Sequence, residues 1–286
     1  MAAHPLPGEP ASDRPRVCGV LGDPIAHSLS PALHRAGYAE VGLEWTYDAH
    51  RVPAGGLADF VAGLDVEWRG LSVTMPLKRE AYALAQRRTA YAELSGAVNT
   101  LVLDSHLEGD NTDLPGAMAA IRERVEQPPG HAVILGGGAT AASLGLALCE
   151  LGVASLEVQV RSPERAREAV AAIDRHAGCP YLLVTELGAA PVRAPDMVVS
   201  TIPAAAQHVA LAAGLHDVPC LFDAVYDPWP TPLAAAAAAA SATVISGLDL
   251  LVHQAALQFT LFTGLAAPLA AMREAGVRAL AARGAS

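Results

Sequence analysis

The feature that most constrains the fold is a glycine-rich turn between an apolar strand and an apolar helix. Residues 131–135 read HAVIL, a continuous apolar run typical of a buried parallel strand, and an apolar helix is predicted to extend to about residue 151. Between them, Gly136, Gly138 and Ala141 occupy the three key positions of the dinucleotide fingerprint. The glycines permit a tight turn and close approach of the backbone to a pyrophosphate, which the helix N-terminus faces. An ordinary strand–helix turn is the alternative, but the flanking segments favour a Rossmann-type unit that contacts its cofactor through Gly136, Gly137, Gly138 and Ala139.

The second strand of this unit indicates which dinucleotide is bound. An NAD site places an acidic residue at the end of that strand, where it binds the ribose 2′-hydroxyl. The strand predicted over 156–161 ends instead in Arg161, followed by Ser162 and, one turn on, by Arg165. Two guanidinium groups and a hydroxyl suit a 2′-phosphate, so we predict NADP; the alternative is a solvated, arginine-rich helix face. Glu157 lies in mid-strand and is not expected to reach the ribose.

The first half of the chain has a different pattern. From residue 16 to residue 113, predicted strands alternate with predicted helices, which is typical of an α/β domain. Ser30 followed by Pro31 predicts a helix N-cap and first turn. A stretch rich in proline and glycine, 127–130, separates this region from the Rossmann-type unit. We therefore predict two α/β domains.

Composition limits the partners and the compartment. The formal net charge of the 286 residues is −10 with no basic run, so nucleic acid and anionic membranes are poor candidate partners. Residues 1–15 are rich in proline without an apolar core, which predicts a disordered tail and not a signal peptide. The alanine run 234–240 is predicted to be a helix of a soluble protein. Four dispersed cysteines match no metal spacing and are interpreted as reduced core thiols of a cytoplasmic protein: Cys18, Cys149, Cys179 and Cys220.

Lys78 is the only lysine in the chain. Of the nineteen lysine and arginine residues in the sequence, the others are all arginine. An arginine does not release its proton in a protein, whereas a lysine can once burial or a neighbouring cation lowers its pKa. Lys78 is therefore a candidate for acid–base chemistry. The alternative is a surface residue at the start of a helix.

Seven motifs taken together are similar to those of one family. They are, in chain order, GDPIAHSLSP (22–31), SVTMPLK (72–78), GAVNT (96–100), GDNTD (109–113), the glycine turn, FDAVYDPWPTPL (222–233) and GLDLLVHQA (247–255). Through them the chain resembles the shikimate dehydrogenases along nearly its whole length beyond the first fifteen residues. The resemblance implies a two-domain enzyme with its active site in the cleft between the domains. The implied reaction is the reversible reduction of 3-dehydroshikimate to shikimate with NADPH, a step in making aromatic amino acids.

The resemblance also implies domain boundaries and residue roles. It places the substrate-binding domain at 16–113 and 248–286, completed by the C-terminal helices, and the NADP-binding Rossmann domain at 114–247. The catalytic residues would be Lys78 and Asp113. The substrate would be bound by Ser28, Ser30, Thr74, Asn99, Asp113, Tyr226 and Gln254. The cofactor would be bound by Gly136, Gly137, Gly138, Ala139, Arg161, Ser162, Arg165 and Gly247.

These assignments agree with the chemistry of ketone reduction, which needs a hydride donor and a proton donor at the developing alkoxide. Lys78 can be that proton donor, and a carboxylate at Asp113 would orient it. Helix capping is the alternative for Ser28, Ser30 and Asp113. The chain departs from the family pattern at three places: Ser72 where many members have asparagine, Val160 where asparagine is common, and the loop 200–203.

Two other functions stay open. A relative acting on quinate or on an aminated shikimate analogue would share most of these motifs, although Arg161 and Arg165 argue against an NAD-linked quinate enzyme. A non-catalytic NADP-binding regulator could dispense with Lys78 and Asp113, so their presence argues against it. Shikimate or its 3-dehydro form is the predicted small-molecule partner, and the sequence leaves open a monomer or a homodimer.

Overall fold

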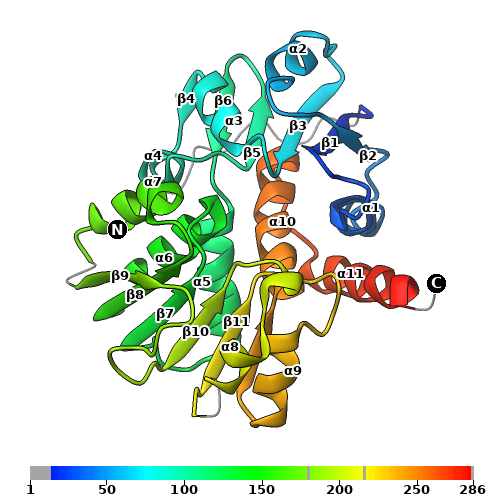
Figure 1. Ribbon diagram of the computed structural model, residues 1–286. Helices are drawn as coiled ribbons and strands as arrows, with labels where there is room; N and C mark the ends of the chain where they lie inside the picture. Colours follow the sequence, from blue (N-terminus) through cyan, green and yellow to red (C-terminus); the bar gives the residue numbers. More distant parts are fainter. Residues whose placement is uncertain (1–13, 179–180, 215–216, 285–286) are drawn as a thin grey trace. The chain divides into compact units, whose positions relative to one another are not determined.

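The computed structural model describes residues 14–178, 181–214 and 217–284 (Figure 1). The predicted tail therefore lies almost wholly outside the described residues, as does Cys179. The chain forms two compact units. The first comprises the residues up to Thr112 together with those from Val252 onward, and the second is Asp113–Leu251.

The first unit is built on a mixed six-stranded sheet. Its strand order is β2-β1-β3-β5-β6-β4. The β1–β2, β1–β3 and β4–β6 pairs are parallel, whereas β3–β5 and β5–β6 are antiparallel. The strands are β1 (Val17–Gly22), β2 (Thr46–Arg51), β3 (Trp68–Val73), β4 (Arg87–Arg88), β5 (Thr100–Leu103) and β6 (Leu107–Asp110). The helices are α1 (Ser30–Glu40), α2 (Leu57–Ala62), α3 (Lys78–Leu84), α4 (Ala90–Ser95), α11 (Leu269–Gly284) and, from Val252 onward, α10 (Gly247–Thr263).

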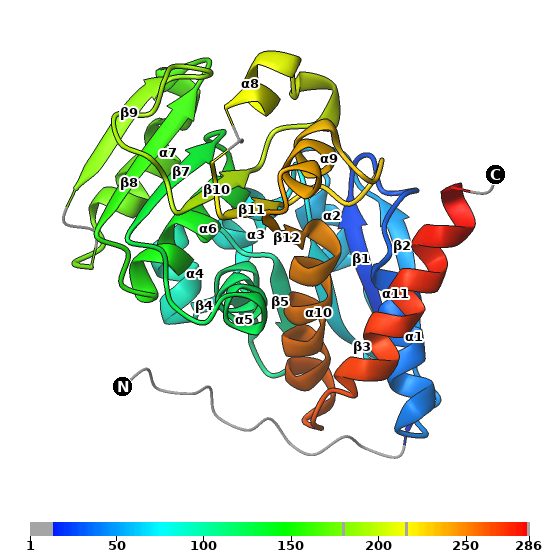
Figure 2. The same cartoon turned by 90° about the horizontal axis from the view of Figure 1, so that it is seen from below.

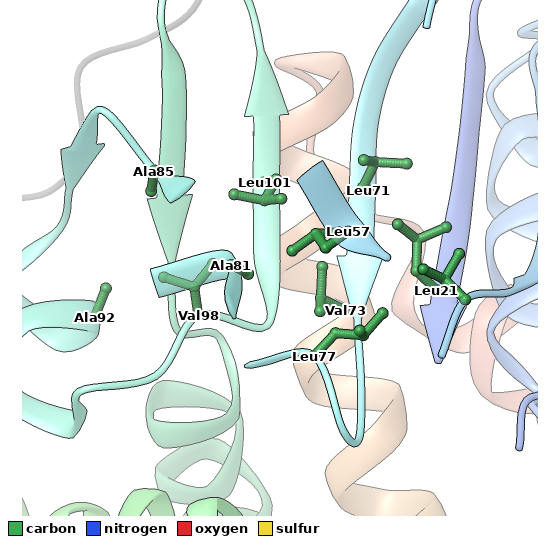
Figure 3. Packing of buried hydrophobic residues seen from close by; sticks show 11 residues of the cluster. Leu21, Leu57, Leu71, Val73, Leu77, Ala81, Ala85, Ala92, Val98 and Leu101 are labelled. Atoms are coloured by element: carbon green, nitrogen blue, oxygen red, sulfur yellow. The ribbon is translucent and has the colours of Figure 1, made fainter. Parts of the chain in front are cut away.

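Alternating residues of β3 face two different layers. Leu71 and Val73 pack on a cluster that includes residues of α2 and α3 (Figure 3). Gly70 and Ser72 face α10 on the other side, where a Cβ on Gly70 would lie 2.2 Å from the ring of Phe262. Only glycine allows α10 to pack this closely on the sheet. Helices α1 and α11, far apart in sequence, lie side by side (Figure 2).

The second unit is a doubly wound parallel sheet. Its strand order is β12-β11-β10-β7-β8-β9, so the chain starts in the middle, builds one half and returns to build the other. All five strand pairs are parallel. The strands are β7 (His131–Leu135), β8 (Ser155–Val160), β9 (Leu182–Glu186), β10 (Met197–Ser200), β11 (Cys220–Asp223) and β12 (Thr243–Ser246). The helices are α5 (Asp113–Arg124), α6 (Ala139–Glu150), α7 (Pro163–Asp174), η1 (Ala204–Ala206), α8 (Val209–Ala213) and α9 (Pro232–Ala239).

Helices cover both faces of this sheet. Val133 and Leu135 belong to a cluster with Leu233 and Ala237 of α9, whereas Ile134 faces α6 near Gly145. Every residue of β7 is buried, which explains why its sequence is continuously apolar instead of alternating. The predicted α/β class, with a Rossmann-type doubly wound unit, is confirmed.

Some local predictions were incomplete or wrong. Helix α4 and the short strand β4 were not predicted, nor were η1 and α8. The alanine run does form a helix, α9, as predicted. The three cysteines within the described residues are buried thiols outside any disulfide, as predicted: Cys18, Cys149 and Cys220.

Candidate active site

The loop between β1 and α1 carries the two predicted carboxylate-binding serines. The predicted N-cap was wrong: Leu29 precedes the helix, and Ser30 is its first residue. Instead, the hydroxyl of Ser28 accepts a hydrogen bond from the backbone N–H of Ser30 at 3.3 Å. Arg283 of α11 donates to the backbone oxygen of His27 at 2.9 Å, which fixes this loop from the far end of the chain.

The segment between β3 and α3 holds Thr74 and Lys78. The N–H of Thr74 donates to the oxygen of Leu21 at 2.9 Å, and the oxygen of Thr74 accepts from the N–H of Leu77. Leu77 is fully buried, and Lys78 begins α3 with its backbone oxygen accepting from the N–H of Val98 at 3.0 Å. The side chain of Lys78 is half-buried. Backbone hydrogen bonds on both sides therefore fix the position from which the lysine extends.

Asn99 and Gln254 lie together in the first unit although 155 residues separate them. The amide nitrogen of Asn99 donates to the Oε1 of Gln254 at 3.4 Å. The Oδ1 of Asn99 accepts from the backbone N–H of Thr112 at 2.8 Å. Asn99 and Gln254 are only 2% and 7% exposed, so their orientations are set by the hydrogen bonds that they make.

A buried polar cluster that the sequence analysis missed lies behind this pair. It contains Tyr47, Ser72, Thr100 and Gln258, which are joined by hydrogen bonds. Burial raises the pKa of the Tyr47 phenol, so this group acts as a neutral hydrogen-bond donor. The available signal was the spacing of Gln254 and Gln258, which are four residues apart and therefore share one face of α10.

The glycine turn of the second unit has the geometry that the fingerprint predicts. Gly136 has a φ of +114°, and a Cβ there would lie 2.3 Å from the Oγ1 of Thr201, which follows β10. Gly137 lies against Ala166 of α7, where a Cβ would approach within 2.4 Å. A Cβ on Gly138, by contrast, would meet no atom within 4 Å. The turn lies where the strand order reverses, between β7 and β10, the place where such sheets bind their ligands.

Helix α6, which follows this turn, has no side-chain cap at its N-terminus. The first backbone N–H groups of any helix have no intrahelical acceptor, and here no side chain caps them. They also carry the positive end of the helix dipole. Together with the open space beside Gly138, these groups fit a pyrophosphate.

Arg161, directly after β8, and Arg165, in the first turn of α7, are both exposed. Ser162 caps α7 by accepting from the backbone N–H of Arg165 at 3.5 Å, which gives this serine a structural role. Glu157 is fully buried in β8, where it accepts from the side chains of Gln159 and Thr185. The junction between β8 and α7 thus presents guanidinium groups. The carboxylate of Glu157 instead accepts hydrogen bonds inside the second unit.

The remaining predicted site residues lie at element ends of the second unit. Asp113 is the first residue of α5 and is 7% exposed. Tyr226 is half-buried after β11, in a segment held by Asp223, whose buried carboxylate accepts from Thr231 at 2.5 Å. Burial raises the pKa of Asp223. A Cβ on Gly247 would lie 2.3 Å from the backbone oxygen of Ala224, so packing alone requires glycine there.

The described residues hold neither a cluster suited to a metal ion nor a helix suited to span a membrane. No group of three or more histidine, cysteine, aspartate or glutamate side chains in that part of the chain could hold a metal ion. None of its helices combines the length and apolar character needed to cross a membrane.

Comparison with known proteins points to a single family. The model of the shikimate dehydrogenase substrate binding domain matches residues 20–101, and that of the shikimate 5′-dehydrogenase C-terminal domain matches residues 247–275. A protein of Moorella thermoacetica named shikimate dehydrogenase (NADP(+)) is 37% identical over 88% of this chain and 90% of its own length.

Solved structures agree. Shikimate dehydrogenase of Mycobacterium tuberculosis superposes with a TM-score of 0.83 at 44% identity, covering 94% of this chain and all of that one. Shikimate 5-dehydrogenase of Thermus thermophilus, in complex with NADP(H) and shikimate, superposes with a TM-score of 0.80 at 31% identity. That match covers 92% of this chain and 99% of the other.

Proposed function

Because the chain belongs to the shikimate dehydrogenase family, we propose that it catalyses the reversible reduction of 3-dehydroshikimate to shikimate with NADPH. The observation that carries this proposal is the extent of the match, since a relative named for shikimate and NADP(+) aligns over 88% of the chain. The proposed reaction places the enzyme in the biosynthesis of aromatic amino acids. We also infer a cytoplasmic enzyme, which the buried reduced thiols support, acting as a monomer or a homodimer.

Shikimate is proposed to bind to side chains of the first unit together with Asp113 and Tyr226. Its carboxylate would be held by the hydroxyls of Ser28 and Ser30 together with Tyr226. Its ring hydroxyls would be bound by Thr74, Asn99, Asp113 and Gln254. The buried hydrogen bonds of Asn99 and Gln254 support this, because a polyol is recognised best by polar groups whose orientation is already fixed.

The second unit is proposed to bind NADP. The open turn at Gly138 and the uncapped start of α6 would hold the pyrophosphate, and Gly136, Gly137, Ala139 and Gly247 would shape the site. Arg161 and Arg165, with the hydroxyl of Ser162, would bind the 2′-phosphate.

Lys78 is proposed as the general acid and base. NADPH supplies the hydride when it is bound. Lys78 would donate a proton to the ketone oxygen as negative charge develops there, and would take it back in the oxidation of shikimate. Asp113 would orient the ammonium group and bind a substrate hydroxyl. The backbone bonds that anchor Thr74, Leu77 and Lys78 support this role, because proton transfer needs a fixed donor.

Replacing Lys78 with arginine tests the chemistry. If Lys78 transfers the proton, Lys78→Arg should lower kcat for shikimate oxidation about 100-fold or more, because a guanidinium does not release its proton near neutral pH. KM should change less, since the loss falls mainly on the transition state.

The matched control is Arg79→Lys, the reverse exchange at the exposed neighbouring position of α3. It should keep kcat near that of the unmodified enzyme. A folded Lys78→Arg enzyme with near-normal kcat would remove proton transfer from Lys78 and leave it a binding residue.

A further inference from the structure

A continuous chain of hydrogen bonds crosses the interior of the first unit. The phenol of Tyr47 donates to the hydroxyl of Ser72 at 2.5 Å, and Ser72 donates to the Oε1 of Gln258 at 2.7 Å. The amide nitrogen of Gln258 then donates to the hydroxyl of Thr100 at 3.0 Å. All four side chains are at most 4% exposed, so bulk water does not compete for these bonds.

The chain continues to the proposed substrate site. The hydroxyl of Thr100 donates to the Oδ1 of Asn99 at 2.8 Å, and the Nδ2 of Asn99 donates to the Oε1 of Gln254. Each hydroxyl along the way accepts from the preceding group and donates to the next. The bonds therefore all run in one direction, from Tyr47 to Gln254.

Two backbone groups fix that direction. The Nε2 of Gln258 donates to the backbone oxygen of Asn99 at 3.2 Å, and a carbonyl oxygen can only accept. The Oδ1 of Asn99 accepts from the backbone N–H of Thr112 at 2.8 Å, and an N–H can only donate. Turning either amide over would place like groups against each other, so both orientations are determined. The Oε1 of Gln254 must then face Asn99, and its amino group faces the opposite way.

We propose that Thr100 and Gln258 are positioning residues that act through Asn99 to present the amino group of Gln254 to a substrate hydroxyl. Gln254 thus recognises its substrate as a hydrogen-bond donor. This inference rests on the proposed function, because it takes Gln254 to be a ligand of shikimate. It adds how that ligand is oriented and which side chains orient it.

Substitution of Thr100 tests the positioning role. Valine has nearly the same shape but removes the hydroxyl that links the amide of Gln258 to the side chain of Asn99, while the bond from Gln258 to the backbone oxygen of Asn99 remains. Thr100→Val should weaken shikimate binding by about tenfold, which is the effect of losing one hydrogen bond. Calorimetry without cofactor measures this affinity. KM for NADP should stay unchanged, and Thr100→Ser, which restores a hydroxyl, should recover most of the affinity.

The matched control is Thr263→Val. Thr263 is also buried, but it lies at the end of α10, where its hydroxyl donates to the backbone oxygen of Phe259 and accepts from the backbone N–H of Leu265, outside the chain of bonds. It should leave shikimate affinity unchanged. The positioning role is overturned if Thr100→Val and Thr263→Val bind shikimate equally well, or if Thr100→Val weakens shikimate binding further in a Gln254→Ala enzyme.

Gln254→Glu tests the donor role. An ionised carboxylate can still accept from Asn99 but cannot donate to the substrate. Shikimate affinity should therefore fall about tenfold at neutral pH and recover as the pH is lowered and the carboxyl is protonated, relative to the unmodified enzyme. Undiminished affinity at neutral pH would mean that Gln254 accepts from the substrate. An unmodified enzyme that binds no shikimate would instead contradict the proposed function.

Discussion

His34 is an ionisable side chain buried beside the polar cluster of the first unit. It is completely buried and stacks on the ring of Tyr47 at 4.1 Å with the planes only 6° apart. Neither ring nitrogen has a hydrogen-bond partner of ordinary geometry. Burial lowers the pKa of His34 to about 3, although the side-chain amide of Gln258 acts in the opposite direction. The folded protein therefore holds this imidazole neutral.

This burial predicts a loss of stability in mild acid. The unfolded chain protonates His34 below its ordinary pKa of about 6.5, whereas the folded chain does so only near 3. Between these values the unfolded state binds more protons, so the free energy of unfolding falls as the pH falls. From pH 7 to pH 5 the contribution of His34 should fall by about 2 kcal/mol.

His34→Phe removes this titration and keeps an aromatic ring over Tyr47. Urea denaturation of both proteins at pH 7 and pH 5 measures the effect. The free energy of unfolding of the unmodified protein should drop by about 2 kcal/mol more than that of the variant. An equal drop in the two proteins would mean that His34 is not held neutral in the fold.

At this scale the sequence indicated candidate site residues but not how they are held. Ser28 and Ser30 were singled out, yet the predicted N-cap at Ser30 is wrong, because Leu29 precedes the helix and no side chain caps it. The bond between Asn99 and Gln254 joins residues 155 apart. No local pattern encodes such a contact, so the orientation of both amides became visible only in the fold.

At the scale of single elements, apolar runs and turn residues predicted most strands and the long helices. Helix α4 was missed although both of its end signals are present. Thr89 caps it by accepting from the N–H of Ala92, and Gly96 ends it with a φ of +62°. The helix has six residues, too few for an apolar period to emerge.

The β8–α7 junction carries the prediction of cofactor choice. Replacing both Arg161 and Arg165 with alanine should weaken NADP binding by about 3 kcal/mol, since charge-assisted hydrogen bonds contribute about 1.5–3 kcal/mol each. NAD binding should hardly change, because NAD lacks the 2′-phosphate. Titration of the purified variants with each dinucleotide measures both.

Arg167 of the same helix supplies the control. It is exposed and lies 3.9 Å from Glu164 in a surface ion pair. Arg167→Ala removes one positive charge from the same helix and should leave NADP affinity nearly unchanged. Equal losses from Arg167→Ala and the double variant would indicate a general charge effect and not a 2′-phosphate site.

At the scale of the whole molecule, two units with different sheets are formed by one chain. The order of the sequence motifs was enough to predict one α/β unit and one Rossmann-type unit. A strand, a glycine turn and a helix specify a doubly wound unit almost alone. The return of residues from Val252 to the first unit was inferred from the family resemblance alone. The periodicity of α10 does not reveal it, since one continuous helix crosses from the second unit into the first.

The measurement that tests the proposed function most directly is kcat/KM of the purified protein for dinucleotide reduction with shikimate or quinate, each with NADP or NAD. Shikimate with NADP should be preferred over the other three pairs by at least about tenfold, the effect of one lost polar contact. A preference for quinate with NAD would instead assign the chain to the quinate branch. If none of the four pairs reduced the dinucleotide, the proposal that this protein is a shikimate dehydrogenase would be wrong.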